Sequence, residues 1–227
     1  MRALSTLEYW GSTIDMREAV TDKIDRELLG ATSQQHMGRA CDVHCAHSVD
    51  LSSLEIGPAE ATYLSNKISR LTSLTSLRVS HNPLRPEGVV SIASNLPCAR
   101  YLQTLRLDSV CMGPLGAKKL AIVLPFSHLQ SVGLRDNGIG PGGARAISET
   151  LVSCTRLTAL DMSCNGIMTE GANAVALHAR ACPLVHLDLS CNSIGAAGLD
   201  ALEVPSRVLM RSVLCASRHR SRANARA

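Results

Sequence analysis

The chain has 227 residues, of which 45% are hydrophobic and 2% aromatic, and its formal net charge is +4. It shows no apolar run of the roughly 20 residues that cross a membrane, and its first segment lacks the apolar stretch of a signal peptide. Its nine cysteines, an odd number without a disulfide-like cluster, are typical of a reducing compartment. We therefore expect a cytoplasmic protein, with the nucleus as the alternative address.

Residues 1–44 are predicted to form an N-terminal cap helix and a linker. A weak capping box precedes apolar residues at helical spacing, which predicts one helix from about Thr13 to Leu29. The glycine that follows is expected to end this helix. Residues 31–40 are then a polar linker.

Residues 45–206 are dominated by an internal repeat. Five frames restate the pattern L-x-x-L-x-L-x-x-N-x-L/I, followed by a glycine four residues on, at spacings that alternate between 28 and 27 residues. The frames begin at Leu74, Leu102, Leu129, Leu157 and Leu184, and a degenerate sixth frame begins at Ala46. Apolar alternation indicates a strand, and apolar residues four apart after the glycine indicate a helix. One frame cannot bury its apolar face alone, so the frames are expected to stack.

An asparagine recurs at the turn that leaves each strand. Its amide can bond backbone groups that no sheet or helix satisfies. We therefore predict a buried ladder of Asn82, Asn137, Asn165 and Asn192. The second frame has Val110 at this position, which cannot make those bonds and predicts a local irregularity beside Cys111.

Residues 207–227 are predicted to be a basic, partly disordered tail. Residues 206–227 hold six arginines and no acid, so the rest of the chain, without these arginines, has a net charge of −2. The strand expected near Arg211 lacks the L-x-L pattern, and we expect the apolar residues from Val208 to Leu214 to fold as a helix over the last repeat. Nucleic acid is expected to bind at most weakly, through this tail.

The repeat pattern resembles the leucine-rich repeat, and its spacing and long helical half are similar to the ribonuclease-inhibitor-like subfamily. This resemblance covers roughly residues 45–206. It implies an α/β fold, a solenoid shaped as a horseshoe arc of about six repeats, with a parallel concave sheet and convex helices. It also implies a non-enzymatic module that binds a protein partner on its concave surface.

The same resemblance leaves two alternatives, because a fold does not choose a function. Relatives in this subfamily include the GTPase-activating protein of Ran and actin regulators. A regulator of a small GTPase and a cytoskeletal scaffold are therefore the alternative functions. The Ran activator family typically carries a long acidic stretch after its repeats, whereas this chain ends in an arginine-rich segment.

The concave face can be predicted from the repeat positions. The outward mid-strand position holds Arg78, Arg106, Gly133, Asp161 and Asp188, so the face passes from basic to acidic. Such a strip orients a partner and sets its register. With neighbouring outward positions included, the expected partner-binding residues are Arg78, Arg106, Asp108, Arg135, Asp161 and Asp188, and Asp136 lies beside them.

Three further patterns suggest chemistry, and each has a simpler explanation. Residues 138–143 match the G-x-G-x-x-G dinucleotide fingerprint, but they are repeat positions without the acidic residue that contacts the ribose. Four zinc-type ligands lie within seven residues instead of in two separated pairs, namely Cys41, His44, Cys45 and His47. Cys164 and Cys191 share one offset on neighbouring strands about 4.8 Å apart, a spacing compatible with a disulfide, although small residues are simply tolerated there.

Catalytic signatures such as G-x-S-x-G, H-E-x-x-H and the phosphate loop do not occur in the sequence. The histidines follow no common repeat offset. We therefore expect no enzyme activity, no cofactor and no metal.

Overall fold

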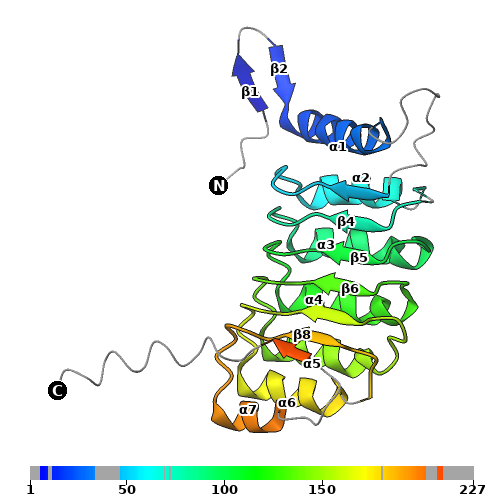
Figure 1. The fold of residues 1–227 in the computed structure, drawn as a ribbon. Coiled ribbons are helices and arrows are strands. Elements are labelled where there is room, and N and C mark those ends of the chain that lie inside the picture. Colours follow the sequence, from blue (N-terminus) through cyan, green and yellow to red (C-terminus); the bar gives the residue numbers. More distant parts are fainter. Residues whose placement is uncertain are drawn as a thin grey trace, which may run out of the picture.

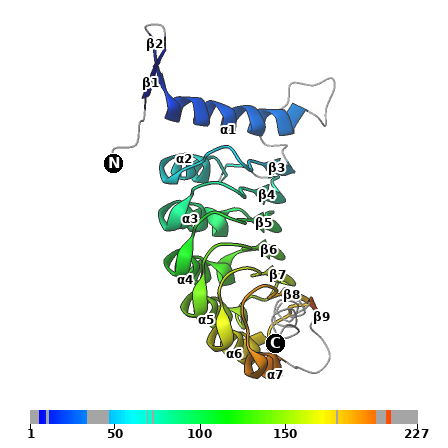
Figure 2. The same cartoon turned by 90° about the vertical axis from the view of Figure 1, so that its left-hand side faces the viewer.

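The computed structural model describes residues 6–9, 12–33, 47–68, 70–71, 73–179, 181–202 and 209–211. Within these residues the chain forms a seven-stranded parallel sheet with the strands in sequence order, and a separate two-stranded hairpin. Figure 1 looks onto the sheet, and Figure 2 shows the strands along one side of the stack and the helices along the other. The predicted α/β leucine-rich-repeat solenoid arc is confirmed.

The strands of the sheet are short and regularly spaced. They are β3 (Ser48–Asp50), β4 (Ser76–Arg78), β5 (Thr104–Arg106), β6 (Ser131–Gly133), β7 (Ala159–Asp161), β8 (His186–Asp188) and β9 (Leu209–Arg211). The helices on the other side are α2 (Pro58–Ile68), α3 (Arg85–Asn95), α4 (Gly113–Val123), α5 (Gly140–Leu151), α6 (Met168–Ala179) and α7 (Ala196–Leu202), with 3-10 turns η2 (Leu96–Cys98) and η3 (Leu124–Phe126). None of the described helices combines the length and apolarity needed to span a membrane.

The middle residue of each strand from β3 to β8 points into the core. Leu77, Leu105 and Leu160 are at most 2% exposed, and each lies in register with the middle residue of the neighbouring strands. Side chains alternate between the two faces of a strand, so the first and third residues lie on the open face. This agrees with the register predicted from the L-x-L pattern.

The glycine of the five regular repeats lets neighbouring helices approach closely. A Cβ atom at Gly143 would lie 2.6 Å from Cγ2 of Ile139 and 3.0 Å from Cβ of Ala117 in the preceding repeat. Gly138 and Gly140 have φ angles of 63° and 65°, a region that favours glycine. The G-x-G-x-x-G match is thus explained by a turn and by helix packing.

The predicted asparagine ladder is confirmed. Asn165 is 2% exposed and donates from Nδ2 to the carbonyl oxygens of Leu134, Met162 and Ser163 at 2.8 to 3.0 Å. Its Oδ1 accepts the backbone N–H groups of Asn137 and Ile139 at 2.9 and 3.3 Å. Each such asparagine therefore connects two repeats through backbone groups that the sheet leaves unpaired.

The irregularity predicted at Val110 is also present. Where Asn137 offers Oδ1 to the N–H groups of Val110 and Met112, Val110 offers the preceding repeat no side-chain acceptor. The N–H of Leu84 turns instead to the carbonyl oxygen of its near neighbour Asn82, at 2.8 Å. Val110 itself is fully buried.

Val110→Asn is expected to complete the ladder and to stabilise the fold by about 1 kcal/mol, the net value of a typical hydrogen bond. The new amide would face the N–H of Leu84 and the carbonyl oxygen of Val79, as Asn137 faces the corresponding groups one repeat on. The measurement is the free energy of unfolding in urea. Val132→Asn, which buries the same amide in the strand core, is the matched control and should destabilise strongly. If Val110→Asn lowered the free energy of unfolding as much as the control does, the ladder account would be contradicted.

The predicted N-terminal helix is wrong at both ends. Strands β1 (Thr6–Tyr9) and β2 (Ser12–Asp15) form the hairpin, and helix α1 spans Met16–Ser33. Thr13 pairs with Glu8 in this hairpin. The β-branched residues at 13 and 14 favour a strand, whereas a single glycine weakens a helix without ending it. The first residues of the predicted linker are consequently helical.

Helix α1 packs on the first repeat and covers the N-terminal end of the stack (Figure 2). Val20, Ile24 and Leu28 are buried at the spacing of one helical face. Asp25 accepts a hydrogen bond from the Tyr63 hydroxyl at 2.8 Å and lies 3.4 Å from Nζ of Lys67. The helix thus serves as the cap that the exposed end of a repeat stack requires.

The prediction for the C-terminal end is wrong in one respect. Leu209–Arg211 form strand β9, which pairs with β8 in parallel, where we expected a helix and a broken repeat frame. Met210 stands in register with Leu187, so one apolar residue continues the row without the L-x-L pattern. Parallel pairing depends on backbone groups, so a strand can join the sheet without the L-x-L pattern. Residues 203–208 and 212–227 lie outside the described residues.

Candidate functional site

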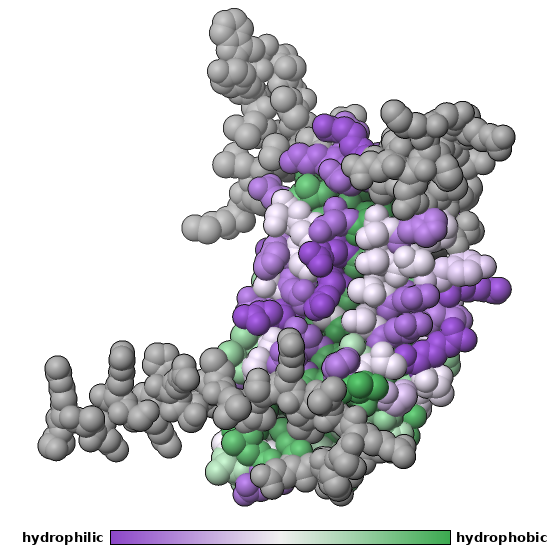
Figure 3. Space-filling model, viewed as in Figure 1, coloured by the Kyte–Doolittle hydropathy of each residue, from purple (hydrophilic) through white to green (hydrophobic). Residues whose placement is uncertain are grey.

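The open face of the sheet carries a row of charged residues at the third position of each strand. We call this the charged row, and its described residues are Asp50, Arg78, Arg106, the uncharged Gly133, Asp161 and Asp188. Figure 3 shows this face, where hydrophilic residues gather over the upper and middle part and hydrophobic patches lie toward the lower end. The order predicted from Arg78 to Asp188 is therefore present on neighbouring strands.

Two members of this position were missed from the sequence. Asp50 belongs to the degenerate first frame, and Arg211 stands in register with Asp188 on β9. Both strands lack part of the leucine pattern that identified the others. The signal that finds them is the backbone register of the sheet.

The arginines of the charged row already face acids of the same chain. Arg78 Nη1 lies 3.6 Å from Oδ2 of Asp50, and Arg106 Nη1 lies 3.9 Å from Oδ2 of Asp161. These side chains are between 27% and 57% exposed, so each pair contributes at most about 1 kcal/mol. Such weak pairs can exchange their acid for one from a partner at little cost.

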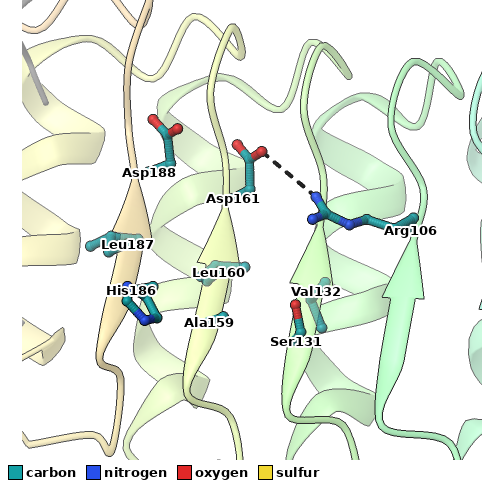
Figure 4. Close-up of a pocket in the computed structure, with 9 residues that line it drawn as sticks. All are labelled: Arg106, Ser131, Val132, Ala159, Leu160, Asp161, His186, Leu187 and Asp188. Atoms are coloured by element: carbon teal, nitrogen blue, oxygen red, sulfur yellow. Dashed lines mark ion pairs between the residues drawn. The ribbon is translucent and has the colours of Figure 1, made fainter. Parts of the chain in front are cut away.

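Gly133 allows Arg106 to reach an acid two strands away. Arg106 is in register with Gly133, which is in register with Asp161. A Cβ atom on Gly133 would lie 2.5 Å from Cδ of Arg106 and 2.8 Å from Oδ1 of Asp108. Figure 4 shows Arg106 extended across β6 toward Asp161. The absence of a side chain at Gly133 therefore allows the Arg106 side chain to cross β6.

A depression with a volume of about 150 Å³ lies over strands β6 to β8. Ser131, Ala159 and His186 line one side, Arg106, Asp161 and Asp188 line the other, and the middle residues of the strands form the floor (Figure 4). Ala159, between Ser131 and His186, contributes only a methyl group to this side of the depression. The depression offers room for one side chain of a ligand.

The acids at this end of the face are held by their own turns. Oδ1 of Asp161 accepts the N–H of Ser163 at 2.9 Å and its hydroxyl at 2.7 Å. Oδ1 of Asp188 accepts the N–H of Ser190 at 2.9 Å. One oxygen of each carboxylate thus fixes the turn after the strand, and the other oxygen of Asp161 faces Arg106 in the weak pair described above.

The neighbouring predicted residues lie in the turns that follow β5 and β6. Oδ1 of Asp108 accepts the N–H of Arg135 at 3.1 Å, and Oδ2 of Asp136 accepts the Ser109 hydroxyl at 2.9 Å. Arg135 is exposed. Asp108 and Asp136 therefore join consecutive repeats through the turns after β5 and β6.

The cysteine positions differ from the simple picture of strand neighbours. Cys164 and Cys191 lie in turns, with φ angles of 57° and 58°, and both carry free thiols. A second pair shares an offset one turn after the helices, Cys154 and Cys182. Burial raises the pKa of Cys154 to about 11, and the nearby Cys182 adds to the rise. This thiol is therefore protonated and unreactive at neutral pH.

Cys41, His44 and Cys45 of the zinc-type cluster lie outside the described residues, and only His47 is within them. Among the described residues, no three His, Cys, Asp or Glu side chains are placed to hold a metal ion together.

A family model described as "Leucine Rich repeat" matches residues 70–93, 127–148, 153–176 and 180–202. These four segments match leucine-rich repeats. The segment between the first two matches contains Val110, the one strand-to-turn position of these five repeats where the ladder asparagine is missing. Repeats of this kind form modules for protein interaction.

The leucine-rich repeats are also similar to part of a curated protein, the "Tonsoku-like protein" of Danio rerio. The two share 26% identity over 148 residues, which cover 62% of this chain and 10% of that protein. The chain therefore matches about a tenth of the length of this relative.

Proposed function

We propose that this leucine-rich-repeat chain is a non-enzymatic module that binds a protein partner on its concave sheet face. The observation that carries the proposal is the charged row, which runs from Arg78 and Arg106 to Asp161 and Asp188 on a face that no described helix covers. A partner with an acidic and a basic end would be aligned by this order of charges.

The proposed contact residues are those of the predicted strip, with different tasks. Arg78 is 54% exposed at its side chain and provides the most accessible cation. Arg106 and Asp161 exchange their mutual pair at 3.9 Å for partner groups, and Asp188 adds a second acid. Asp108 and Arg135 lie beside this row, where Asp108 mainly fixes the turn. The charged row has no aromatic residue, so arginines are its binding anchors.

Charge reversal of Arg78 and Arg106 together is expected to weaken partner binding by more than tenfold, about 1.4 kcal/mol, and single reversals by less. The partner is first captured from lysate and identified by mass spectrometry, and its affinity is then measured with purified protein. Lys118→Glu/Lys119→Glu on exposed positions of α4 is the matched control. Equal binding by the concave variant, with a loss in the helix variant, would place the interface on the convex side.

We also propose the ribonuclease-inhibitor-like subfamily and a cytoplasmic or nuclear address. The helices of eleven or twelve residues and the spacing of 27 to 28 residues support the subfamily. No feature of the described residues favours regulation of a small GTPase or a cytoskeletal scaffold over a general binding module. GTP hydrolysis by small GTPases, measured with and without the protein, separates the first alternative because a binding module leaves the rate unchanged.

A further inference from the structure

The end of the charged row formed by Asp161 and Asp188, which we call the acid end, lies beside the strand from which the arginine-rich segment leaves. Asp188 is on β8, and β8 pairs directly with β9, whose last residue is Arg211. The next arginines along the chain are Arg218, Arg220 and Arg222. The most basic segment of the chain therefore begins next to the acidic half of the sheet face.

We propose that residues 218–222 of this chain bind across the acid end of the concave face of the same molecule. This inference does not depend on the proposed function, because it concerns a contact within the chain. It assigns an occupant to the depression over β6 to β8, namely an arginine side chain of the tail.

The length of the chain permits this contact. Arg218 lies seven residues after Arg211, and an extended chain spans up to about 3.3 to 3.6 Å per residue, so roughly 23 to 25 Å can be covered. Neighbouring strands are about 4.8 Å apart, so the acids on β8 and β7 lie roughly 5 and 10 Å from β9. All three arginines can therefore reach the acid end.

The spacing of the arginines suits the surface. Arg218, Arg220 and Arg222 alternate with other residues, so an extended chain presents them on one side. Asp161 and Asp188 keep Oδ1 in their turns, which leaves Oδ2 of each toward the open face. Within the part of the chain that the structure describes, the cation paired with Oδ2 of Asp161 is the Arg106 guanidinium at 3.9 Å, a distance that leaves room for a second cation. The floor of the depression, with Leu160 and Leu187, can contact the aliphatic stem of an arginine.

A single exposed ion pair is weak, so the covalent attachment of the tail to β9 is needed to stabilise the contact. Attachment to β9 converts the contact into an intramolecular one, at an effective concentration in the millimolar range. The presence of several arginines near two acids further stabilises the contact. The consequence is that a partner with a basic end has to displace the tail from the acid end, and that added salt weakens the internal contact.

The test uses a fluorescent synthetic peptide of residues 212–227, titrated at low salt by anisotropy. The affinity of the peptide is measured for three proteins. They are the full chain, the full-length variant Arg218→Gln/Arg220→Gln/Arg222→Gln (the arginine variant), and the arginine variant with Asp161→Asn/Asp188→Asn added. The asparagines retain the turn acceptors, so these chains should fold. We expect the peptide to bind the arginine variant at least tenfold more tightly than the parent, because the parent's own tail occupies the face. The added asparagines should abolish that binding.

The matched control adds Glu87→Gln/Glu149→Gln to the arginine variant. It removes two exposed acids from helices α3 and α5 and should leave the affinity of that variant for the peptide unchanged. Equal affinity for the parent and the arginine variant would overturn the proposal, as would binding that survives loss of both aspartates. A full chain that sediments as a dimer only while its tail arginines are present would also overturn it, because the occupant would then be the tail of a second copy.

Discussion

Leu160→Asp is expected to destabilise the fold by at least about 4 kcal/mol, the largest single effect that the repeat register implies. Leu160 is 2% exposed and lies between Val132 and Leu187 on the neighbouring strands. The substitution removes a packed side chain and places an unpaired carboxylate where water does not reach. Denaturant unfolding followed by circular dichroism measures the effect.

Asp161→Asn is the control for this experiment, because it changes the adjacent residue on the opposite face of β7. The asparagine keeps the oxygen that accepts the Ser163 N–H, and it loses only the exposed pair with Arg106. We expect a change within about 1 kcal/mol. A stable Leu160→Asp protein beside an unstable Asp161→Asn protein would show that the register is reversed.

Asn165→Ala is expected to cost about 3 to 5 kcal/mol, because it removes the shared acceptor of two buried N–H groups as well as three donor contacts. The carbonyl oxygens lose fewer of their hydrogen bonds in this variant than the N–H groups do. Leu134 O and Met162 O each retain a bond from the neighbouring ladder residue, Asn137 or Asn192. The N–H groups of Asn137 and Ile139 have no second acceptor of this kind.

Asn173→Ala on the exposed side of α6 removes an identical amide without buried partners, and should change the stability by less than about 0.5 kcal/mol. Thermal and urea unfolding of both variants give the comparison. A cost for Asn165→Ala no greater than for Asn173→Ala would mean that the ladder does not hold the repeats together.

The parts of the fold that the sequence predicts are those that recur. Leu77, Leu105 and Leu160 repeat at fixed offsets because each fills an equivalent slot, and Asn165 repeats because each turn leaves the same backbone groups unpaired. The same logic identified the local change at Val110. Because the same structure recurs in every repeat, its sequence pattern occurs several times, and both the pattern and a departure from it can be recognised.

The features that the sequence did not predict occur where repetition stops or where side-chain reach decides. The hairpin before α1 and strand β9 lie beyond the regular frames. The pairing of Arg106 with Asp161 depends on a side chain that crosses one strand over Gly133, and an offset along the chain does not encode this distance. The sequence therefore predicted which charges share the face, but not that the arginines are already paired.

The central claim, that the charged row recognises the partner, is tested most directly by a double-mutant cycle. Arg78→Gln and Arg106→Gln are each combined with neutralisation of single acids of the captured partner, and the affinity of every combination is measured. We expect at least one arginine–acid combination to lose less affinity than the two single changes add up to, by 0.5 kcal/mol or more, as contacting residues do. Additive losses for every concave combination, together with coupling between Lys118 or Lys119 of α4 and the partner, would contradict the account.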